Sequence, residues 1–383
     1  GGPLGPVALL EHRQGVQKRE GDHRRVMKLT VAVVAYGRYK YLDEAAASIA
    51  RQTRPPDEVL VFTDNREAVR PIFQKHGVEA EILQEPDIAL CATYARIGEV
   101  ASGDYVLPLE DDDVFKPEKL ERLEPVLREG RWTLVKHAAD FIDAESKPTT
   151  WIQQPEKPAV ITRENAWQLY RRFPYNVWPS TFAVKTDLLK RHGEILKRLL
   201  LHADFAIFTL ALKDGEVFYL PEKLTYYRIG PGHSQTTTCN DIPKIVCTWN
   251  KYTHDDDILS KYIDTKEINK IIIYEYIAHL FKIYILNTKF DCTFKYKTSY
   301  FSLVKKSFMA VAKRVYPPRA VMFAWVSPLL GRKRAAEMYH PPRAVSLAWL
   351  PPLLAWLSPL LGRKRAAEIY YRRWCRMLQK SAK

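Results

Sequence analysis

Short apolar runs rich in β-branched residues alternate with helix-like segments along the first half of this 383-residue chain. The pattern predicts strands at 29–35, 58–63, 79–83, 105–109 and 132–138. Helical patterns fill the gaps between these runs, and strands that alternate with helices form βαβ units. The sequence therefore predicts an α/β fold with a mostly parallel, Rossmann-like sheet flanked by helices.

Polar residues follow three of these runs directly. Tyr36 comes after the first run, Asp64 after the second, and the acidic segment (residues 110–113, Glu-Asp-Asp-Asp) after the fourth. Ligands of open α/β sheets bind beyond the carboxyl ends of the strands. We therefore expect a ligand site where these residues meet.

The acidic segment places four like charges at one strand end, which repel each other. Mg²⁺ and Mn²⁺ take carboxylate ligands and often share them with a diphosphate. The alternative is a solvated turn whose Asp residues cap the helix that begins near Pro117. On the segment alone, both interpretations remain open.

A second acidic triplet, Asp255-Asp256-Asp257, follows no strand-like run. Carboxylates at the start of a helix complement its dipole. We therefore predict that this triplet lies at a helix N-terminus and carries no site.

The two ends of the chain differ from its body. Residues 1–26 lack periodicity and are predicted to be a disordered leader or tag. Residues 316–383 hold 13 of the 59 Lys and Arg residues and two of the 44 acidic ones, and they contain an internal repeat with Pro and Trp. This basic tail predicts peripheral contact with an anionic membrane surface; the alternative is a pair of hairpins packed on the body.

Two further features concern partners and location. The basic tail has no nucleic-acid-binding module, so no nucleic acid partner is predicted. Five scattered cysteines without a CxxC pair fit a reducing cytosol. The predicted location is cytoplasmic, with the tail at the inner face of the cell membrane.

Several motifs, taken in order, resemble family 2 glycosyltransferases of the GT-A fold over about residues 28–237. They are 33–38 (VVAYGR), 48–53 (SIARQT), 57–61 (DEVLV), 93–96 (TYAR), 109–113 (LEDDD) with Pro117, 202–205 (HADF) and 220–228 (LPEKLTYYR). The resemblance implies a catalytic domain at 27–238. An Ile-, Tyr- and Lys-rich helical pattern predicts a helical C-terminal extension at 239–315, which the basic tail at 316–383 follows. The resemblance also implies an inverting, hexosyltransferase-type enzyme that uses a nucleotide-diphosphate sugar and a glycan or lipid-linked acceptor.

The resemblance also assigns residues to roles. Asp204 is the expected catalytic base. The expected metal ligands for Mg²⁺ or Mn²⁺ are Glu110, Asp112 and His233. The expected donor-binding residues are Ala35, Tyr36, Arg38, Asp64, Arg96, Asp111 and Arg228.

This chain departs from the family pattern at two positions. Glu110 stands at the first position of the Asp-x-Asp motif, and Ala203 replaces the Glu that precedes the catalytic Asp. These departures motivate an alternative, a catalytically degenerate nucleotide-sugar-binding module held at the membrane surface. A sugar nucleotidylyltransferase is disfavoured because the loop at 36–40 is poor in glycine.

Overall fold

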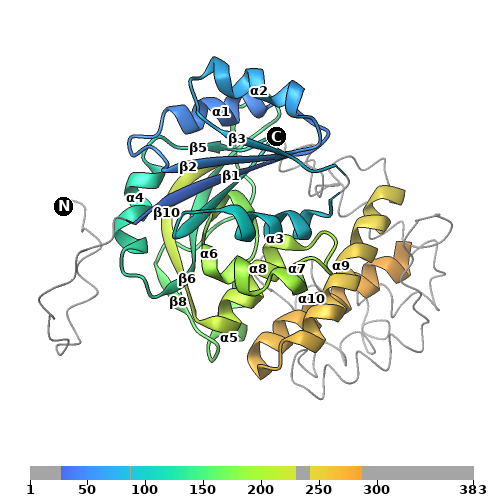
Figure 1. Cartoon of the computed structure of the whole chain (residues 1–383). Helices are drawn as coiled ribbons and strands as arrows, with labels where there is room; N and C mark the ends of the chain where they lie inside the picture. Colours follow the sequence, from blue (N-terminus) through green and yellow to red (C-terminus); the bar gives the residue numbers. More distant parts are fainter. Residues whose placement is uncertain (1–26, 87, 230–241, 287–383) are drawn as a thin grey trace, which may run out of the picture.

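The computed structural model describes residues 27–86, 88–229 and 242–286 (Figure 1). Several predictions therefore lie outside the described residues: the leader at 1–26, His233, the part of the helical extension at 287–315, and the basic tail at 316–383. Within the described ranges, no helix combines the length and the apolar character that crossing a bilayer requires.

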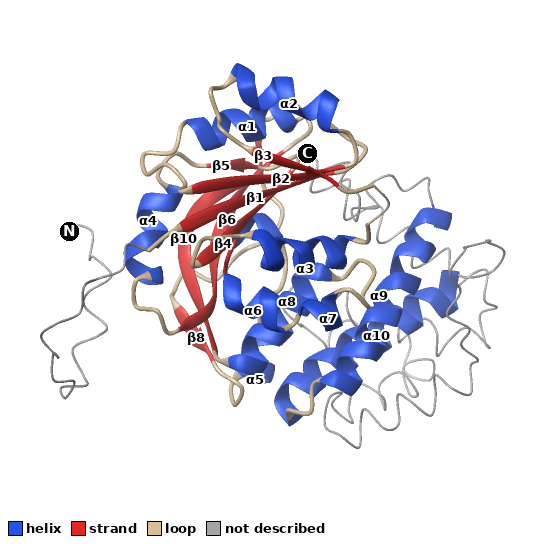
Figure 2. Ribbon diagram, viewed as in Figure 1, coloured by secondary structure: helices blue, strands red, loops and turns tan. Residues whose placement is uncertain are grey.

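The centre of the molecule is a ten-stranded sheet with the order β3-β2-β1-β4-β9-β6-β10-β5, to which β7 adds on β6 and β8 on β10 (Figure 2). The strands are β1 (Leu29–Ala35), β2 (Glu58–Thr63), β3 (Glu81–Gln84), β4 (Tyr105–Glu110), β5 (Val114–Phe115), β6 (Trp132–Ile142), β7 (Pro148–Thr149), β8 (Ala159–Ile161), β9 (Phe182–Lys185) and β10 (Glu216–Arg228). The first four strands pair in parallel, as the alternation predicts. β9 runs antiparallel between β4 and β6, so the complete sheet is mixed.

Helices cover both faces of the sheet (Figure 1). They are α1 (Leu42–Ala50), α2 (Arg66–Lys75), α3 (Leu90–Val100), α4 (Lys119–Leu127), α5 (Ala166–Tyr170), α6 (Thr186–Arg191), α7 (Gly193–Leu196), α8 (Ala203–Asp214), α9 (Ile242–Tyr262) and α10 (Lys266–Leu286), with a 3₁₀ helix, η2 (Pro179–Thr181), before β9. The predicted α/β class with a central sheet flanked by helices is confirmed.

The pleat of β1 shows why its sequence is a continuous apolar run. Every residue of β1 is buried. Leu29, Val31 and Val33 belong to the core beneath α1, α2 and α4. Ala32 and Val34 belong to the larger core that includes α3, α6, α8, α9 and α10. A strand buried on both faces cannot alternate apolar with polar residues.

One strand is irregular, and one predicted feature differs from the structure. The pairing of β10 with β6 shifts register between Leu220 and Lys223. Pro221 lies in this gap, and proline has no amide hydrogen to give to a ladder. The triplet at 255–257 lies inside α9 rather than at its start, because the helix begins at Ile242.

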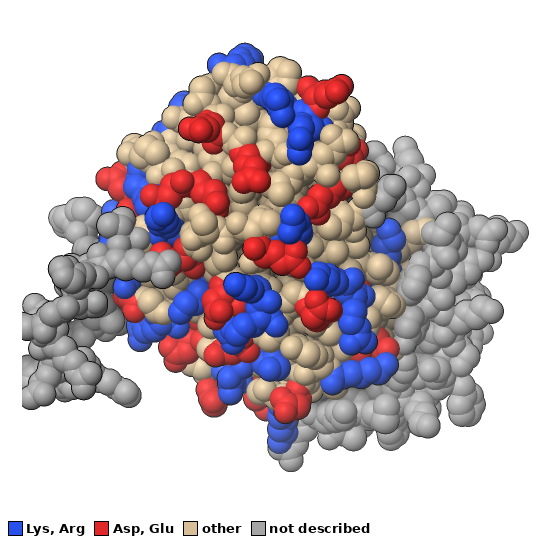
Figure 3. All heavy atoms as spheres, viewed as in Figure 1, with Lys and Arg blue, Asp and Glu red and all other residues tan. Residues whose placement is uncertain are grey.

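The described surface carries no single sign of charge. On the face drawn in Figure 3, acidic and basic side chains are interspersed over the described residues. This agrees with a sequence whose excess positive charge is concentrated at 316–383.

The close approach of α3 and α6 gives a prediction about stability. A Cβ atom on Gly98 would lie 2.7 Å from the backbone carbon of Leu189 and 2.7 Å from the backbone nitrogen of Lys190. Gly98→Ala should therefore lower the free energy of unfolding by about 1–3 kcal/mol, the usual cost of overpacking, as measured by urea denaturation. Gly193→Ala is the control, since no atom lies within 4 Å of its added Cβ. Equal losses in both variants would contradict this account.

Candidate active site

The carboxyl ends of β1, β2 and β4 meet at one edge of the sheet. Ala35 pairs with Thr63, and Val34 pairs with Glu110, so the three strands end at nearly the same level. The residues that follow each strand therefore leave the sheet side by side. This edge holds the predicted donor-binding and metal-binding segments.

The turn after β1 is hydrogen-bonded to Asp64, the residue that follows β2. Gly37 has a φ of +65°, a value that glycine adopts without strain. Its amide donates to Asp64 Oδ1 at 3.1 Å, and the Tyr39 hydroxyl donates to the same oxygen. Burial opposes ionisation of Asp64, but the hydrogen bonds from Tyr39 and Gly37 prevail and lower its pKa. Asp64 is thus held as a carboxylate, while burial raises the pKa of neighbouring Tyr36 to about 12.

Three carboxylates converge beyond β4. Single oxygens of Glu110, Asp112 and Asp113 lie within 4.8 Å of one another, and this is the one group of its kind among the residues that the structure describes. Asp113 is fully buried, and its Oδ2 has no hydrogen-bond partner. Burial, followed by the charge of nearby carboxylates, raises the pKa of Glu110 and of Asp113 well above their usual ranges. A hard divalent cation would relieve both effects, so this donor set fits Mg²⁺ or Mn²⁺.

Asp111 pairs with the guanidinium group of Arg38 and does not belong to the group formed by Glu110, Asp112 and Asp113. Arg38 Nη2 donates to Asp111 Oδ1 at 2.7 Å, and Arg38 Nη1 lies 3.4 Å from Asp112 Oδ2. Burial and the charge of Asp112 raise the pKa of Asp111 to about 7, against the opposing charge of Arg38. Two predicted donor-binding residues, Arg38 and Asp111, therefore meet each other on the acidic segment.

Arg228, at the end of β10, is buried and supports the acidic segment. Its backbone amide donates to Asp113 Oδ1 at 2.8 Å, and its Nε donates to the Asp112 carbonyl oxygen at 2.8 Å. Nη1 donates to Asp143 and Ser146, and Nη2 pairs with Glu44 at 2.9 Å. All three guanidinium nitrogens thus have protein acceptors in this structure. The predicted phosphate contact of Arg228 stays a prediction.

Arg96 lies on α3, with 38% of its side chain exposed. Its Nε donates to Glu85 at 2.8 Å, and its Nη1 donates to Glu99 at 3.1 Å. Glu85 follows β3 directly, so this pair sits beside the same edge of the sheet. These hydrogen bonds, first the one to Glu85 and then the one to Glu99, raise the pKa of Arg96.

Asp204, the expected base, is the second residue of α8 rather than its N-cap, which is His202. Its Oδ1 accepts the Phe205 amide at 2.8 Å. Burial raises the pKa of Asp204, while His202 opposes the shift. The charge of Asp204 is also one of the causes that raise the pKa of Glu110. A carboxylate whose pKa is raised is a stronger proton acceptor than an ordinary one, as a general base requires.

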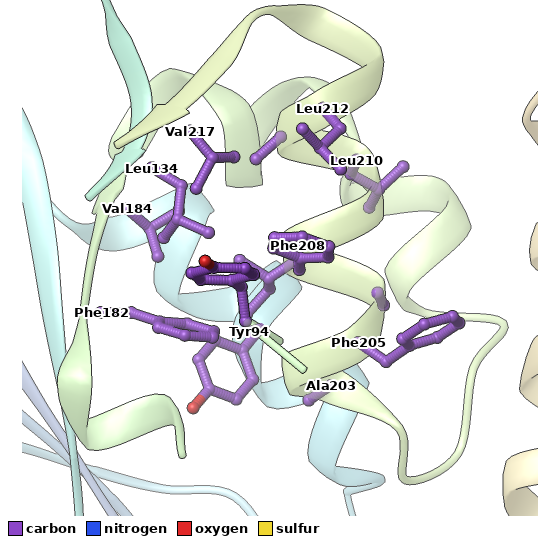
Figure 4. Packing of buried hydrophobic residues seen from close by; sticks show 14 of the residues in the cluster. Tyr94, Leu134, Phe182, Val184, Ala203, Phe205, Phe208, Leu210, Leu212 and Val217 are labelled. Carbon is purple, nitrogen blue, oxygen red and sulfur yellow. The ribbon is translucent and has the colours of Figure 1, made fainter. Parts of the chain in front are cut away.

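Ala203, by contrast, belongs to the apolar core. Figure 4 shows Ala203 with Phe205 and Phe208 of α8 and with Tyr94 of α3, and Ala203 is 1% exposed. The departure from the family pattern at this position thus places a small apolar side chain in a packed core.

Comparison with known sequences identifies the domain. The sequence profile of Glycosyl transferase family 2 matches residues 30–192. These residues form a family 2 glycosyltransferase domain. The chain is 27% identical over 227 residues to an uncharacterised glycosyltransferase of Nostoc sp. (strain PCC 7120), which covers 53% of this chain and 65% of the relative. It is 28% identical over 124 residues to the uncharacterised glycosyltransferase YwdF of Bacillus subtilis (strain 168), which covers 32% and 42% respectively. The chain thus spans less than two thirds of the length of these relatives.

Solved structures agree on the fold. The crystal structure of S. aureus TarS 1–349 superposes with a TM-score of 0.53 at 16% sequence identity and covers 91% of this chain and 92% of TarS 1–349. The structure of the same protein in complex with UDP-GlcNAc superposes with a TM-score of 0.53 at 15% identity. The chain therefore has the GT-A fold that the sequence predicts.

Asp113 and two buried lysines of the glycosyltransferase domain are not among the site residues that the sequence predicts. Lys119 Nζ donates to the Ser180 carbonyl at 2.6 Å, and Lys136 Nζ donates to the Val177 carbonyl at 2.7 Å. Both lysines are fully buried, and burial lowers the pKa of each, against the attraction of Asp113. A lysine inside the apolar run at 132–138 was the available signal.

Proposed function

We propose that the chain transfers a hexose from a nucleotide-diphosphate sugar to a hydroxyl of a glycan or lipid-linked acceptor, with inversion. The observation that carries the proposal is the three-carboxylate group of Glu110, Asp112 and Asp113 at the carboxyl end of β4. It lies beside the turn that Asp64 fastens, where a nucleotide could lie along the edge of the sheet. TarS, which shares the fold, has been crystallised with UDP-GlcNAc, so UDP sugars are the first donors to test.

The reaction is a direct displacement at the anomeric carbon. The acceptor oxygen forms a bond to that carbon from the face opposite the diphosphate, and the bond from the carbon to the diphosphate oxygen breaks. Asp204 accepts the proton of the acceptor hydroxyl, for which its raised pKa suits it. Because the acceptor oxygen attacks the face of the anomeric carbon opposite the departing diphosphate, the configuration at that carbon inverts.

The donor-binding residues divide by their positions. Asp64 and the backbone at Ala35 and Tyr36 border the expected place of the nucleotide base. Arg38 and Arg96 supply guanidinium groups suited to phosphate oxygens, and Asp111 orients Arg38. Arg228 supports the acidic segment through its hydrogen bond to the Asp112 carbonyl oxygen, in addition to its predicted phosphate contact.

Glu110, Asp112 and Asp113 would hold Mg²⁺ or Mn²⁺, with His233 as a further predicted ligand. When bound, the ion would neutralise charge on the departing diphosphate as a Lewis acid.

Attachment to an anionic membrane surface through 316–383, at the cytoplasmic side, is part of the proposal. The composition of that segment supports it, because basic clusters flank Trp-containing apolar runs.

The experiment that tests the proposal measures nucleoside diphosphate release from a panel of UDP and GDP sugars with Mn²⁺ or Mg²⁺. Metal-dependent release from one donor is the expected result. A second candidate function is nucleotide-sugar binding without catalysis, which the apolar environment of Ala203 favours. Binding of a nucleoside diphosphate with no release from any donor would support this second candidate.

Asp64→Asn gives a separate prediction about the nucleotide. Removal of the charge weakens hydrogen bonds that a carboxylate accepts, and such bonds contribute about 1.5–3 kcal/mol. We therefore expect the Kd for the nucleoside diphosphate to rise by at least about 10-fold in calorimetric titration. Asp43→Asn is the control, because Asp43 pairs with Lys75 at the exposed surface. An unchanged Kd for Asp64→Asn would contradict the assignment.

A further inference from the structure

Two residues of the acidic triplet at 255–257, which the sequence places at a helix start, are buried. Asp255 and Asp256 are both 0% exposed, inside α9. An ionised carboxylate in a protein interior is costly unless it is paired and hydrogen-bonded. The partners of these two carboxylates therefore explain why they are there.

Asp255 binds the backbone just before α8. Its Oδ1 accepts the amide of Leu200 at 2.8 Å, and its Oδ2 accepts the amides of Leu201 and His202 at 2.8 Å each. Three consecutive amides thus converge on one carboxylate, which fixes the path of the chain into the first turn of α8.

Asp256 joins three helices. Its Oδ1 lies 2.9 Å from His202 Nδ1, at the start of α8, and its Oδ2 lies 2.8 Å from His279 Nδ1 of α10. The His202 ring stacks on Tyr252 of α9 at 4.3 Å and on Phe205 of α8 at 4.6 Å. Figure 1 shows α8 beside the α9–α10 pair.

We propose that α9 and α10 belong to the catalytic unit, and that Asp256 is a positioning residue that acts through His202 to hold Asp204. The inference rests on the proposed role of Asp204 as the base. Asp204 lies two residues after His202, in the first turn of α8. Its carboxylate therefore moves with the backbone that Asp255 binds and with the residue whose ring Asp256 holds. A displacement of about 1 Å at a reacting group can lower a rate by about 100-fold.

The protonation state of His202 adds a dependence on pH, which a purely structural packing role would not give. Burial by itself would lower the pKa of His202, but the charge of Asp256 and its hydrogen bond outweigh burial and raise the pKa to about 8. The other titratable groups that face or act on His202 are Asp255 and Tyr252 of α9, His279 and Glu275 of α10, and Asp204 of its own helix.

The sign of the pH effect follows from the raised pKa. The charged pair of His202 and Asp256 stabilises the fold fully below about pH 6.5, the ordinary pKa of histidine. This stabilisation is lost as the pH rises through about 8, the pKa of His202 in the folded protein. The kcat of the unaltered protein should therefore fall as the pH rises through about 8.

The test compares Asp256→Asn with Asp214→Asn. Asp214 ends the same helix, and its Oδ2 lies 2.8 Å from Nε2 of the buried His192. Both changes break a buried His–carboxylate pair, and both should lower the melting temperature. Asp256→Asn should lower kcat by about 10- to 100-fold and leave the Kd for UDP with Mn²⁺ within about two-fold, whereas Asp214→Asn should leave kcat unchanged.

A second variant covers the case in which Asp256→Asn does not fold. His202→Asn keeps an N–H donor near the position of Nδ1 but cannot titrate, so it should remove the fall in kcat near pH 8. Asp257→Asn is the surface control, because Asp257 pairs with Lys261 on the same helix.

Two outcomes are distinct. An active parent protein whose kcat and pH profile are unchanged in both Asp256→Asn and His202→Asn would overturn this inference alone. A parent protein that releases no nucleoside diphosphate from any donor would overturn the proposed function and this inference with it.

Discussion

Asp204→Asn should lower the kcat of sugar transfer by about 10²- to 10⁴-fold, the usual contribution of a general base. The amide keeps the shape of the side chain and can still accept the Phe205 amide, so α8 should begin in the same way. It cannot take a proton from the acceptor hydroxyl. The measurement is steady-state transfer at saturating donor, and the Kd for the donor should stay within about two-fold of the parent value.

A matched control for Asp204 is Asp187→Asn. Asp187 lies in the first turn of α6, as Asp204 lies in that of α8, but its side chain is 60% exposed and pairs with Arg191. This variant should keep full activity. If Asp204→Asn retained a kcat within about three-fold of the parent, another group would have to be the base.

Asp112→Asn should lower kcat/KM by about 10²- to 10³-fold, in the range found when one group that stabilises transition-state charge is removed. Asp112 is 6% exposed and belongs to the three-carboxylate group. Loss of its charge leaves Glu110 and Asp113 as the remaining carboxylates, which should weaken the apparent affinity for Mn²⁺. A titration of activity against Mn²⁺ measures both effects.

The control for Asp112 is Asp140→Asn. Asp140 is a carboxylate of β6 that pairs with Lys116 and Lys223 at 2.8 Å each and is not part of the three-carboxylate group. Its variant should respond to Mn²⁺ as the parent does. An Asp112→Asn variant with the parent's Mn²⁺ dependence would show that the ion, if one is used, binds elsewhere.

The sequence predicts the edge of the sheet well, for a physical reason. The bounds of β1 and β2 are as predicted, because strands buried on both faces have no choice but continuous apolar runs. Because these strands are parallel, their carboxyl ends lie at the same edge of the sheet. The position of Asp64 and of the acidic segment at that edge follows from the strand bounds alone. Local sequence patterns carry this information.

What the sequence cannot predict depends on contacts between distant residues. The sequence alone does not distinguish Asp111 from Asp113, since both are aspartates of the same acidic segment. The position of Arg38 decides that Asp111 is the one outside the three-carboxylate group. The triplet at 255–257 matches a helix start in composition. The burial of Asp255 and Asp256 depends on His202 and on the amides before α8, more than 50 residues away in the chain.

Anomalous diffraction from crystals grown with Mn²⁺ and a nucleoside diphosphate would show whether the three-carboxylate group binds an ion. We expect one strong manganese peak at about 2.0–2.3 Å from a carboxylate oxygen of Asp112, bridged to the diphosphate, with Glu110 or Asp113 nearby. A nucleotide bound at the edge of the sheet with no manganese at this group, or with manganese bound elsewhere, would contradict this expectation.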